Sequence, residues 1–134
     1  MTLSHEIFWL CMVTLFTSVM WVPYIINRMA EMGIWPALYN PQPDIRPTAQ
    51  WAERMMRAHE NAVENLVIFA PLVILTEITQ LHSASSNFAV SLYFYARLIH
   101  FIAFTLAIPL IRVATFLAGF GAQLILGLNL LNII

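Results

Sequence analysis

The sequence predicts an all-α integral membrane four-helix bundle, formed by one domain over residues 1–134. Hydrophobic residues make up 60% of the chain and charged residues only 10%, against roughly 25% charged in a typical soluble domain. The mean hydropathy is +0.77. The apolar residues fall into four long stretches, and a soluble fold of this size could not bury so much apolar surface.

The first helix is predicted over residues 5–30. Its central part, residues 7–26, carries no charge and has about the 20 residues that cross a bilayer. This run is too long for the hydrophobic region of a signal peptide and has no basic segment before it, so we expect it to stay in the membrane. Pro23 is expected to bend the helix near its end. Residues 33–50 contain four prolines and are expected to form the one long loop.

The other helices are predicted over residues 51–81, 88–108 and 111–134. The second helix is charged in its first half and free of charge over residues 65–76. The third carries Arg97 near its middle and is ended by Pro109, and the fourth has no charge after Arg112. The first and last helices can therefore face lipid, whereas the two inner helices need polar surroundings.

The distribution of arginine predicts the orientation in the inner (cell) membrane. Four arginines lie in or beside the first loop, namely Arg28, Arg46, Arg54 and Arg57. Arg112 lies at the connection between the third and fourth helices. Because basic residues favour the cytoplasmic side, both of these connections are expected in the cytoplasm and both termini outside.

Several classes of function are excluded by composition. The net charge is −1 and there is no lysine, so no basic surface is available for a nucleic acid partner. The single cysteine, Cys11, excludes an intramolecular disulfide and a cysteine-based zinc site. The four histidines do not have the spacing of metal ligands, and we expect no metal.

Each inner helix has one polar face. On a helical wheel Arg57, Asn61 and Glu64 share an arc of the second helix. The third helix carries a similar face, formed by Tyr93, Arg97, His100 and Phe104. A lone charge at the bilayer centre costs at least ~2.5 kcal/mol, so these groups must face one another, a partner subunit or a polar cavity. We expect a structural ion pair between Glu64 and Arg97, although polar faces can also serve only as contacts between helices.

The basic residues point to an anionic ligand. A guanidinium group binds a carboxylate with two parallel hydrogen bonds, which a lysine cannot do. Arg112 follows Pro109 at the start of the fourth helix, where free N–H groups and the helix dipole also favour an anion. It could hold a carboxylate or stabilise a thiolate. Two alternatives stay open. The exclusive use of arginine could be a matter of chance in a chain with six basic residues, and Arg112 could be an ordinary positive residue at the cytoplasmic membrane surface.

These residues resemble a known family. The second helix contains the pattern Glu53-Arg54-x-x-Arg57-Ala58-x-x-Asn61-x-x-Glu64, followed later by Tyr95-Ala96-Arg97-Leu98-Ile99-His100 and Pro109-Leu110-Ile111-Arg112. This series is similar to that of the MAPEG family, the membrane-associated proteins in eicosanoid and glutathione metabolism. The resemblance covers essentially the whole chain.

The resemblance implies a homotrimer with glutathione as co-substrate, bound between subunits near the cytoplasm. Arg57, Asn61 and Glu64 would contact glutathione, Arg28 would bind one of its carboxylates and His100 would line the site. Arg112 would be the catalytic residue that stabilises the thiolate. The implied function is a glutathione-dependent transferase or peroxidase that attacks a lipophilic electrophile, a hydroperoxide or an epoxide.

Three positions depart from the family pattern. Phe104 and Phe116 stand where a tyrosine is found in eicosanoid-processing members, and Val113 stands where serine or threonine is common. Tyr93 would supply a substitute hydroxyl to the ligand. These departures favour an alternative, a non-catalytic trimeric membrane protein that binds a lipid or a partner between subunits. A third reading is a small transporter or channel subunit whose polar faces line a pore.

Overall fold

The computed structural model describes residues 2–39 and 46–134, and every regular element in these ranges is a helix. In chain order the helices are α1 (His5–Val19), α2 (Trp21–Met32), α3 (Ile34–Tyr39), α4 (Gln50–Thr79), α5 (Ala84–Thr105) and α6 (Pro109–Leu130). Four are long and apolar enough to cross a membrane when α1 and α2 are counted as one. The predicted fold class is therefore confirmed.

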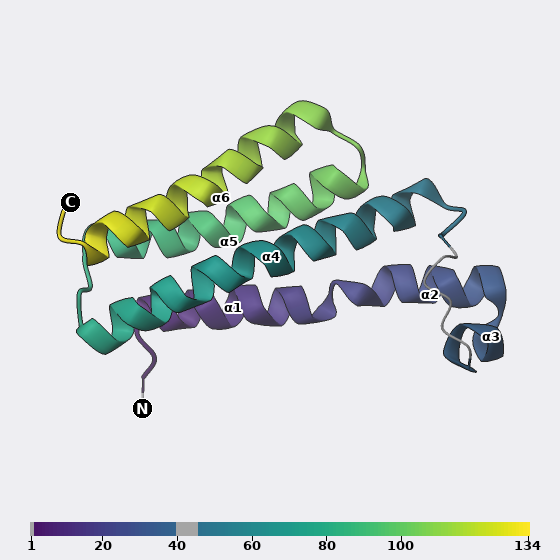
Figure 1. The fold of residues 1–134 in the computed structure, drawn as a ribbon, viewed down its shortest axis with the longest axis horizontal. Coiled ribbons are helices and arrows are strands. Elements are labelled where there is room, and N and C mark those ends of the chain that lie inside the picture. The colour runs from purple at the N-terminus through teal and green to yellow at the C-terminus, as the bar shows by residue number, and fades with distance from the viewer. Residues whose placement is uncertain (1, 40–45) are drawn as a thin grey trace.

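The long helices lie side by side, with their axes roughly along the longest dimension of the molecule (Figure 1). Both termini and the α4–α5 connection lie at one end of the bundle. The α5–α6 connection and α3 lie at the other end, which we call the loop end. The connection between the first two membrane-crossing helices and the connection between the last two, which were predicted to share a side of the membrane, thus lie at the same end. Within the bundle, α5 packs against α1, α4 and α6.

The first membrane-crossing helix is interrupted where a bend was predicted. α1 ends at Val19 and α2 begins at Trp21, with a turn at Met20 between them. Pro23 explains the break, because it has no N–H to donate to the carbonyl of Val19 and its ring crowds that carbonyl. Gly33, with a φ of 88°, ends α2.

The predicted loop over residues 33–50 is partly helical, which corrects that expectation. α3 occupies Ile34–Tyr39 and α4 begins at Gln50. Pro36 does not prevent α3, because it stands in the first turn, where no helical hydrogen bond needs its N–H. Pro41 and Pro43 lie outside the described residues.

The third membrane-crossing helix begins four residues earlier than predicted. α5 starts at Ala84 because Ser83 and Ser86 form a capping box. The Ser83 hydroxyl accepts from the Ser86 N–H at 3.0 Å, and the Ser86 hydroxyl accepts from the Ser83 N–H at 2.9 Å. The predicted bounds left both serines in the connection between the second and third helices, although serine is a residue that commonly begins a helix.

Among the residues that the structure describes, buried apolar side chains form two core clusters. One is centred on the stacked rings of Phe69 and Tyr93, whose centroids are 3.7 Å apart, and includes Val13 and Leu126. The other lies towards the loop end and is built from Met20, Met55, Ala58, Ala62 and Phe101. The small side chains of Ala58 and Ala62 allow α4 to approach its neighbours closely.

A polar network at the end opposite the loop end was not foreseen. We call it the terminal cluster, and its members are Ser4, Glu6, Glu77, His82 and Ser86. The Glu6 carboxylate is buried, accepts from the Ser86 hydroxyl at 2.6 Å and lies 3.0 Å from Nδ1 of His82. The Ser4 hydroxyl donates to Glu77 at 2.5 Å. The cluster therefore joins the start of α1 to the end of α4 and the start of α5.

Removal of the Glu6 carboxylate is expected to destabilise the bundle. In Glu6→Ala, Nδ1 of His82 loses its carboxylate partner, and the Ser86 hydroxyl keeps only the carbonyl of Ser83 as an acceptor, at 3.0 Å. We expect a loss of about 2–4 kcal/mol, since hydrogen bonds to charged groups contribute ~1.5–3 kcal/mol each. Thermal unfolding of the detergent-solubilised protein measures this loss. His5→Ala is the control, because His5 is exposed and bonds only Trp9 among the described residues. Equal unfolding temperatures for the two variants would contradict the prediction.

Candidate functional site

A polar cavity of about 350 Å³ lies at the loop end, between the start of α4, the end of α5 and the start of α6. We call it the arginine pocket. It is lined by Gln50, Glu53, Arg54, Arg57, Phe104 and Arg112. Three guanidinium groups face a single carboxylate, so the pocket carries a net positive charge among its lining residues.

One face of α4 supplies most of this lining. Residues at spacings of three and four project from the same side of a helix, which explains why Gln50, Glu53, Arg54 and Arg57 reach one cavity. Nη2 of Arg57 lies 3.3 Å from Oε1 of Glu53, and Nη1 of Arg46 lies 2.7 Å from the same oxygen. The Arg57 side chain remains 60% exposed, so a ligand can reach it.

Arg112 enters the pocket from the first turn of α6. Pro109 opens this helix, and the Arg112 N–H bonds the carbonyl of Ile108 at 3.1 Å. The guanidinium carbon of Arg112 lies 5.1 Å from the centre of the Phe104 ring. Arg112 is half-buried, and its charge adds to the positive end of the α6 dipole.

Arg54 also lines the pocket, although the sequence analysis did not propose it as a ligand-binding residue. Its Nε donates to the carbonyl of Thr105 at 2.9 Å, where α5 ends. The last carbonyls of a helix carry partial negative charge, so this contact satisfies one of them and fixes α5 against α4. Its place in the pattern over residues 53–64 could have indicated a role at the site. Its partner, the Thr105 carbonyl, could not be predicted, because this contact depends on how the end of α5 packs against α4.

A polar layer lies behind the pocket, between the two apolar clusters. Arg97 is 4% exposed, and its Nη2 donates to Oδ1 of Asn61 at 2.7 Å. Nδ2 of Asn65 also donates to Oδ1 of Asn61, at 3.3 Å, and Gln123 donates to the carbonyl of Asn65 at 3.1 Å. Nε and Nη1 of Arg97 have no hydrogen-bond partner within the described part of the chain.

The expected ion pair between Glu64 and Arg97 is not formed among the described residues. Arg97 bonds Asn61 instead, whereas Glu64 is exposed. Asn61 and Glu64 are three residues apart, about 60° around the helix, so the packing of α4 on α5 brings only Asn61 towards Arg97. The polar layer is thus a contact between a charged guanidinium and neutral amides.

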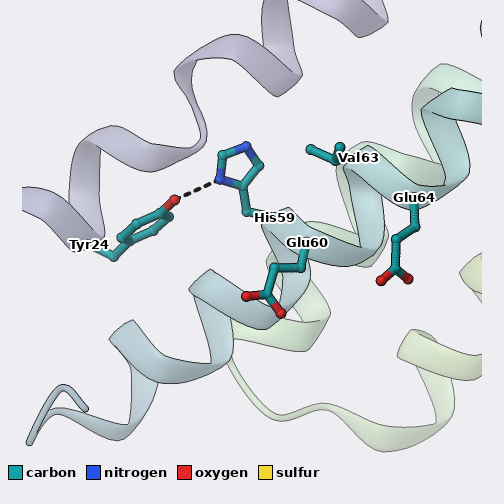
Figure 2. A pocket seen from close by; sticks show the side chains of 5 residues that line it. All are labelled: Tyr24, His59, Glu60, Val63 and Glu64. Carbon is teal, nitrogen blue, oxygen red and sulfur yellow. Dashed lines mark hydrogen bonds between the residues drawn. The ribbon is translucent and has the colours of Figure 1, made fainter. Parts of the chain in front are cut away.

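Glu64 lines a second cavity, of about 420 Å³, on another side of α4, together with Tyr24, His59, Glu60 and Val63. The Tyr24 hydroxyl lies 2.7 Å from Nδ1 of His59 and so links α2 to α4. Figure 2 shows His59 turned towards Tyr24, while Glu64 lies farther along α4 and apart from this pair.

The remaining predicted residues lie apart from the arginine pocket. Arg28 lines a separate cavity of about 250 Å³ beside Tyr24 and Met56. His100 is 2% exposed and lies behind Phe104, with 5.7 Å between the two ring centres. Tyr93 is 1% exposed and stacked in the core, so it offers no surface to a ligand in this chain.

The structure therefore brings two of the predicted ligand residues, Arg57 and Arg112, into one cavity. Asn61 belongs to the polar layer and His100 is buried behind Phe104, whereas Glu64 and Arg28 line other cavities of the same chain. A comparison of the sequence with family models matches the model described as the MAPEG family over residues 7–132. No curated protein and no solved structure matches the chain.

Proposed function

This chain belongs to the MAPEG family, and we propose that it is a membrane-bound glutathione-dependent transferase or peroxidase. Family membership supports a membrane role related to glutathione in general. The observation that carries the specific proposal is the meeting of Arg57 and Arg112 in one positive cavity at the loop end. Glutathione has two carboxylates and a thiol, and a cluster of guanidinium groups suits all three in their charged forms.

The proposed chemistry begins with a thiolate. A positive charge beside a thiol favours its ionised form, and the thiolate is the nucleophile. Arg112 would stabilise this thiolate, while Arg57 would bind a carboxylate of the same glutathione molecule. Attack of the sulfur on a lipophilic electrophile then forms a C–S bond while a leaving group such as halide is expelled or the C–O bond of an epoxide opens. With a hydroperoxide, the O–O bond breaks, the outer oxygen passes to sulfur as a sulfenic acid, and the other oxygen leaves as an alcohol after taking up a proton. Asn61 and His100 would support the site from behind, through Arg97 and Phe104.

A homotrimer is part of the proposal, and Glu64 supports it. This exposed carboxylate lies three residues beyond Asn61, at the depth of the buried Arg97. An ionised carboxylate facing lipid at that depth costs at least ~2.5 kcal/mol, so a second copy of the chain is expected to cover it. Such a neighbour would also bring its own Arg28 towards glutathione bound between subunits. Arg28 and the arginine pocket lie in separate cavities of one chain, which agrees with sites shared between copies.

The proposed location is the inner membrane, with the loop end in the cytoplasm, where glutathione is present. The arginines that line the pocket are the same residues that predict this orientation. Lipid would contact the exposed apolar residues of α1 and α6, and a lipophilic electrophile could enter from the bilayer.

The test of this proposal is binding of glutathione to the purified protein. We expect calorimetry to show binding in the micromolar-to-millimolar range, with a trimer confirmed by native mass spectrometry. S-methylglutathione is the control ligand, because it keeps both carboxylates but cannot form a thiolate. It should bind more weakly, and the difference should grow as the pH rises. An intact trimer that binds neither compound would refute the proposal.

A second candidate is a non-catalytic trimer that binds a lipid or a partner between subunits. The lack of a hydroxyl at Phe104 and Val113 favours it, because neither side chain can donate a hydrogen bond to a thiolate. Conjugation of glutathione to an aryl halide separates the two candidates. A rate above background that is lost in Arg112→Ala would exclude the non-catalytic reading.

A further inference from the structure

We propose that Phe104 is a positioning residue for Arg112, and that its ring holds the guanidinium in place without using any of its N–H groups. The positioning itself rests on the geometry of the arginine pocket. Its effect on the reaction rests on the proposed function.

The contact between the two residues has the geometry of a cation–π interaction. The guanidinium carbon of Arg112 lies 5.1 Å from the centre of the Phe104 ring, within the ~6 Å over which a cation is attracted to an aromatic face. Both side chains are half-buried and both line the arginine pocket. Partial removal of water strengthens such a contact relative to a fully exposed one.

The ring is the contact that orients this guanidinium. Across residues 2–39 and 46–134, no guanidinium nitrogen of Arg112 makes a hydrogen bond or an ion pair. A guanidinium group is planar and directs its five N–H donors outward from its edge. The contact with the Phe104 ring is not a hydrogen bond to any of these donors. All the donors of Arg112 therefore remain available to an anion.

Phe104 is itself held from behind. The ring of His100 meets it edge-on, with 5.7 Å between centres and 68° between planes. His100 also contacts Phe116 on α6, with 6.0 Å between the ring centres. Phe104 thus lies between a buried histidine and the arginine, and α5 supplies a fixed support for a side chain of α6. A long arginine side chain without such a support would sample many rotamers.

The phenylalanine therefore has a function that does not depend on a hydroxyl. A tyrosine at this position would keep the ring and add a hydrogen-bonding group. A leucine would keep an apolar side chain and remove the π-face. These two changes separate the role of the ring from that of the hydroxyl.

The first test measures the freedom of Arg112 directly, with no thiol present. Phenylglyoxal modifies guanidinium groups, and mass spectrometry of peptides gives the rate at Arg112 alone. We expect Phe104→Leu to raise this rate about two- to fivefold, the range that corresponds to a partly exposed cation–π contact. Phe104→Tyr should keep the wild-type rate. Phe120→Leu is the matched control, because Phe120 is an exposed ring on α6 without a ring contact in the described ranges.

The second test follows the bound thiol. If glutathione binds, Phe104→Leu should lower kcat more than it raises KM, and the ultraviolet absorbance of the thiolate should emerge at higher pH. Phe104→Tyr should restore both properties. Unchanged labelling of Arg112 in a correctly assembled Phe104→Leu variant would overturn the proposal, and Phe104→Met serves the same purpose if the leucine variant does not assemble. Faster labelling in a protein that binds no glutathione would refute the proposed function and leave the positioning role standing.

Discussion

Arg112→Ala is expected to lower kcat/KM for glutathione conjugation or peroxide reduction by about 10²–10³-fold, the effect of removing one preorganised donor from a charge-stabilising site. Arg112 contributes a full positive charge in a pocket where its guanidinium group makes no hydrogen bond to the described residues. Most of its interaction is therefore available to a developing or resting thiolate. Loss of that charge should act on the chemical step more than on binding, since Arg57 would still hold a carboxylate.

Steady-state kinetics with an aryl halide and with an organic hydroperoxide measures this effect, and thiolate absorbance gives the cause. Arg46→Ala is the matched control. Its guanidinium is exposed, pairs with Glu53 and lies outside the lining of the arginine pocket. An exposed ion pair contributes little, about 0–1 kcal/mol, so activity should change by less than about fivefold. Similar losses in both variants would argue against a specific role for Arg112.

The fold could be predicted because lipid imposes a simple rule on the sequence. Each span needs a long apolar run, and four such runs occur with charges and prolines between them. The ends of the helices were less predictable, because they depend on single local contacts. Ser83 and Ser86 start α5 through a capping box, and the break near Met20 depends on the carbonyl that Pro23 leaves without a donor.

The candidate site could be predicted only in part. Residue chemistry and spacing singled out Arg57 and Arg112, and the structure places both in one cavity. The partner of Arg97 could not be chosen from a helical wheel, because Asn61 and Glu64 differ by only about 60° around α4. The packing angle between α4 and α5 decides between them. The contact between Glu6 and His82 joins residues far apart in the chain, and no local sequence pattern predicts it.

The largest expected effect on stability comes from Asn61→Leu. Arg97 is buried, and among the described residues Asn61 is the acceptor of its guanidinium. Removing one partner from a buried charged contact strands the other in a low-dielectric interior, which typically costs about 3–5 kcal/mol. We expect a large fall in the unfolding temperature of the detergent-solubilised protein. Asn87→Leu is the control, because Asn87 is an exposed α5 residue whose side chain makes no hydrogen bond in the described ranges.

The double variant Asn61→Leu/Arg97→Met distinguishes a stranded charge from a simple packing defect. If the charge of Arg97 causes the loss, removing it together with its acceptor should recover most of the stability, since apolar replacements of buried polar pairs are often neutral. Gly119 lies against the Arg97 side chain: a Cβ added at Gly119 would be 3.4 Å from Cδ of Arg97. The space at this position is therefore narrow, and we choose methionine as the replacement because its side chain is unbranched. Double-variant stability no higher than that of Asn61→Leu alone would show that the polar layer acts through the shape of Asn61. Recovered stability with lost activity would mean that this buried arginine serves the site at the expense of the fold.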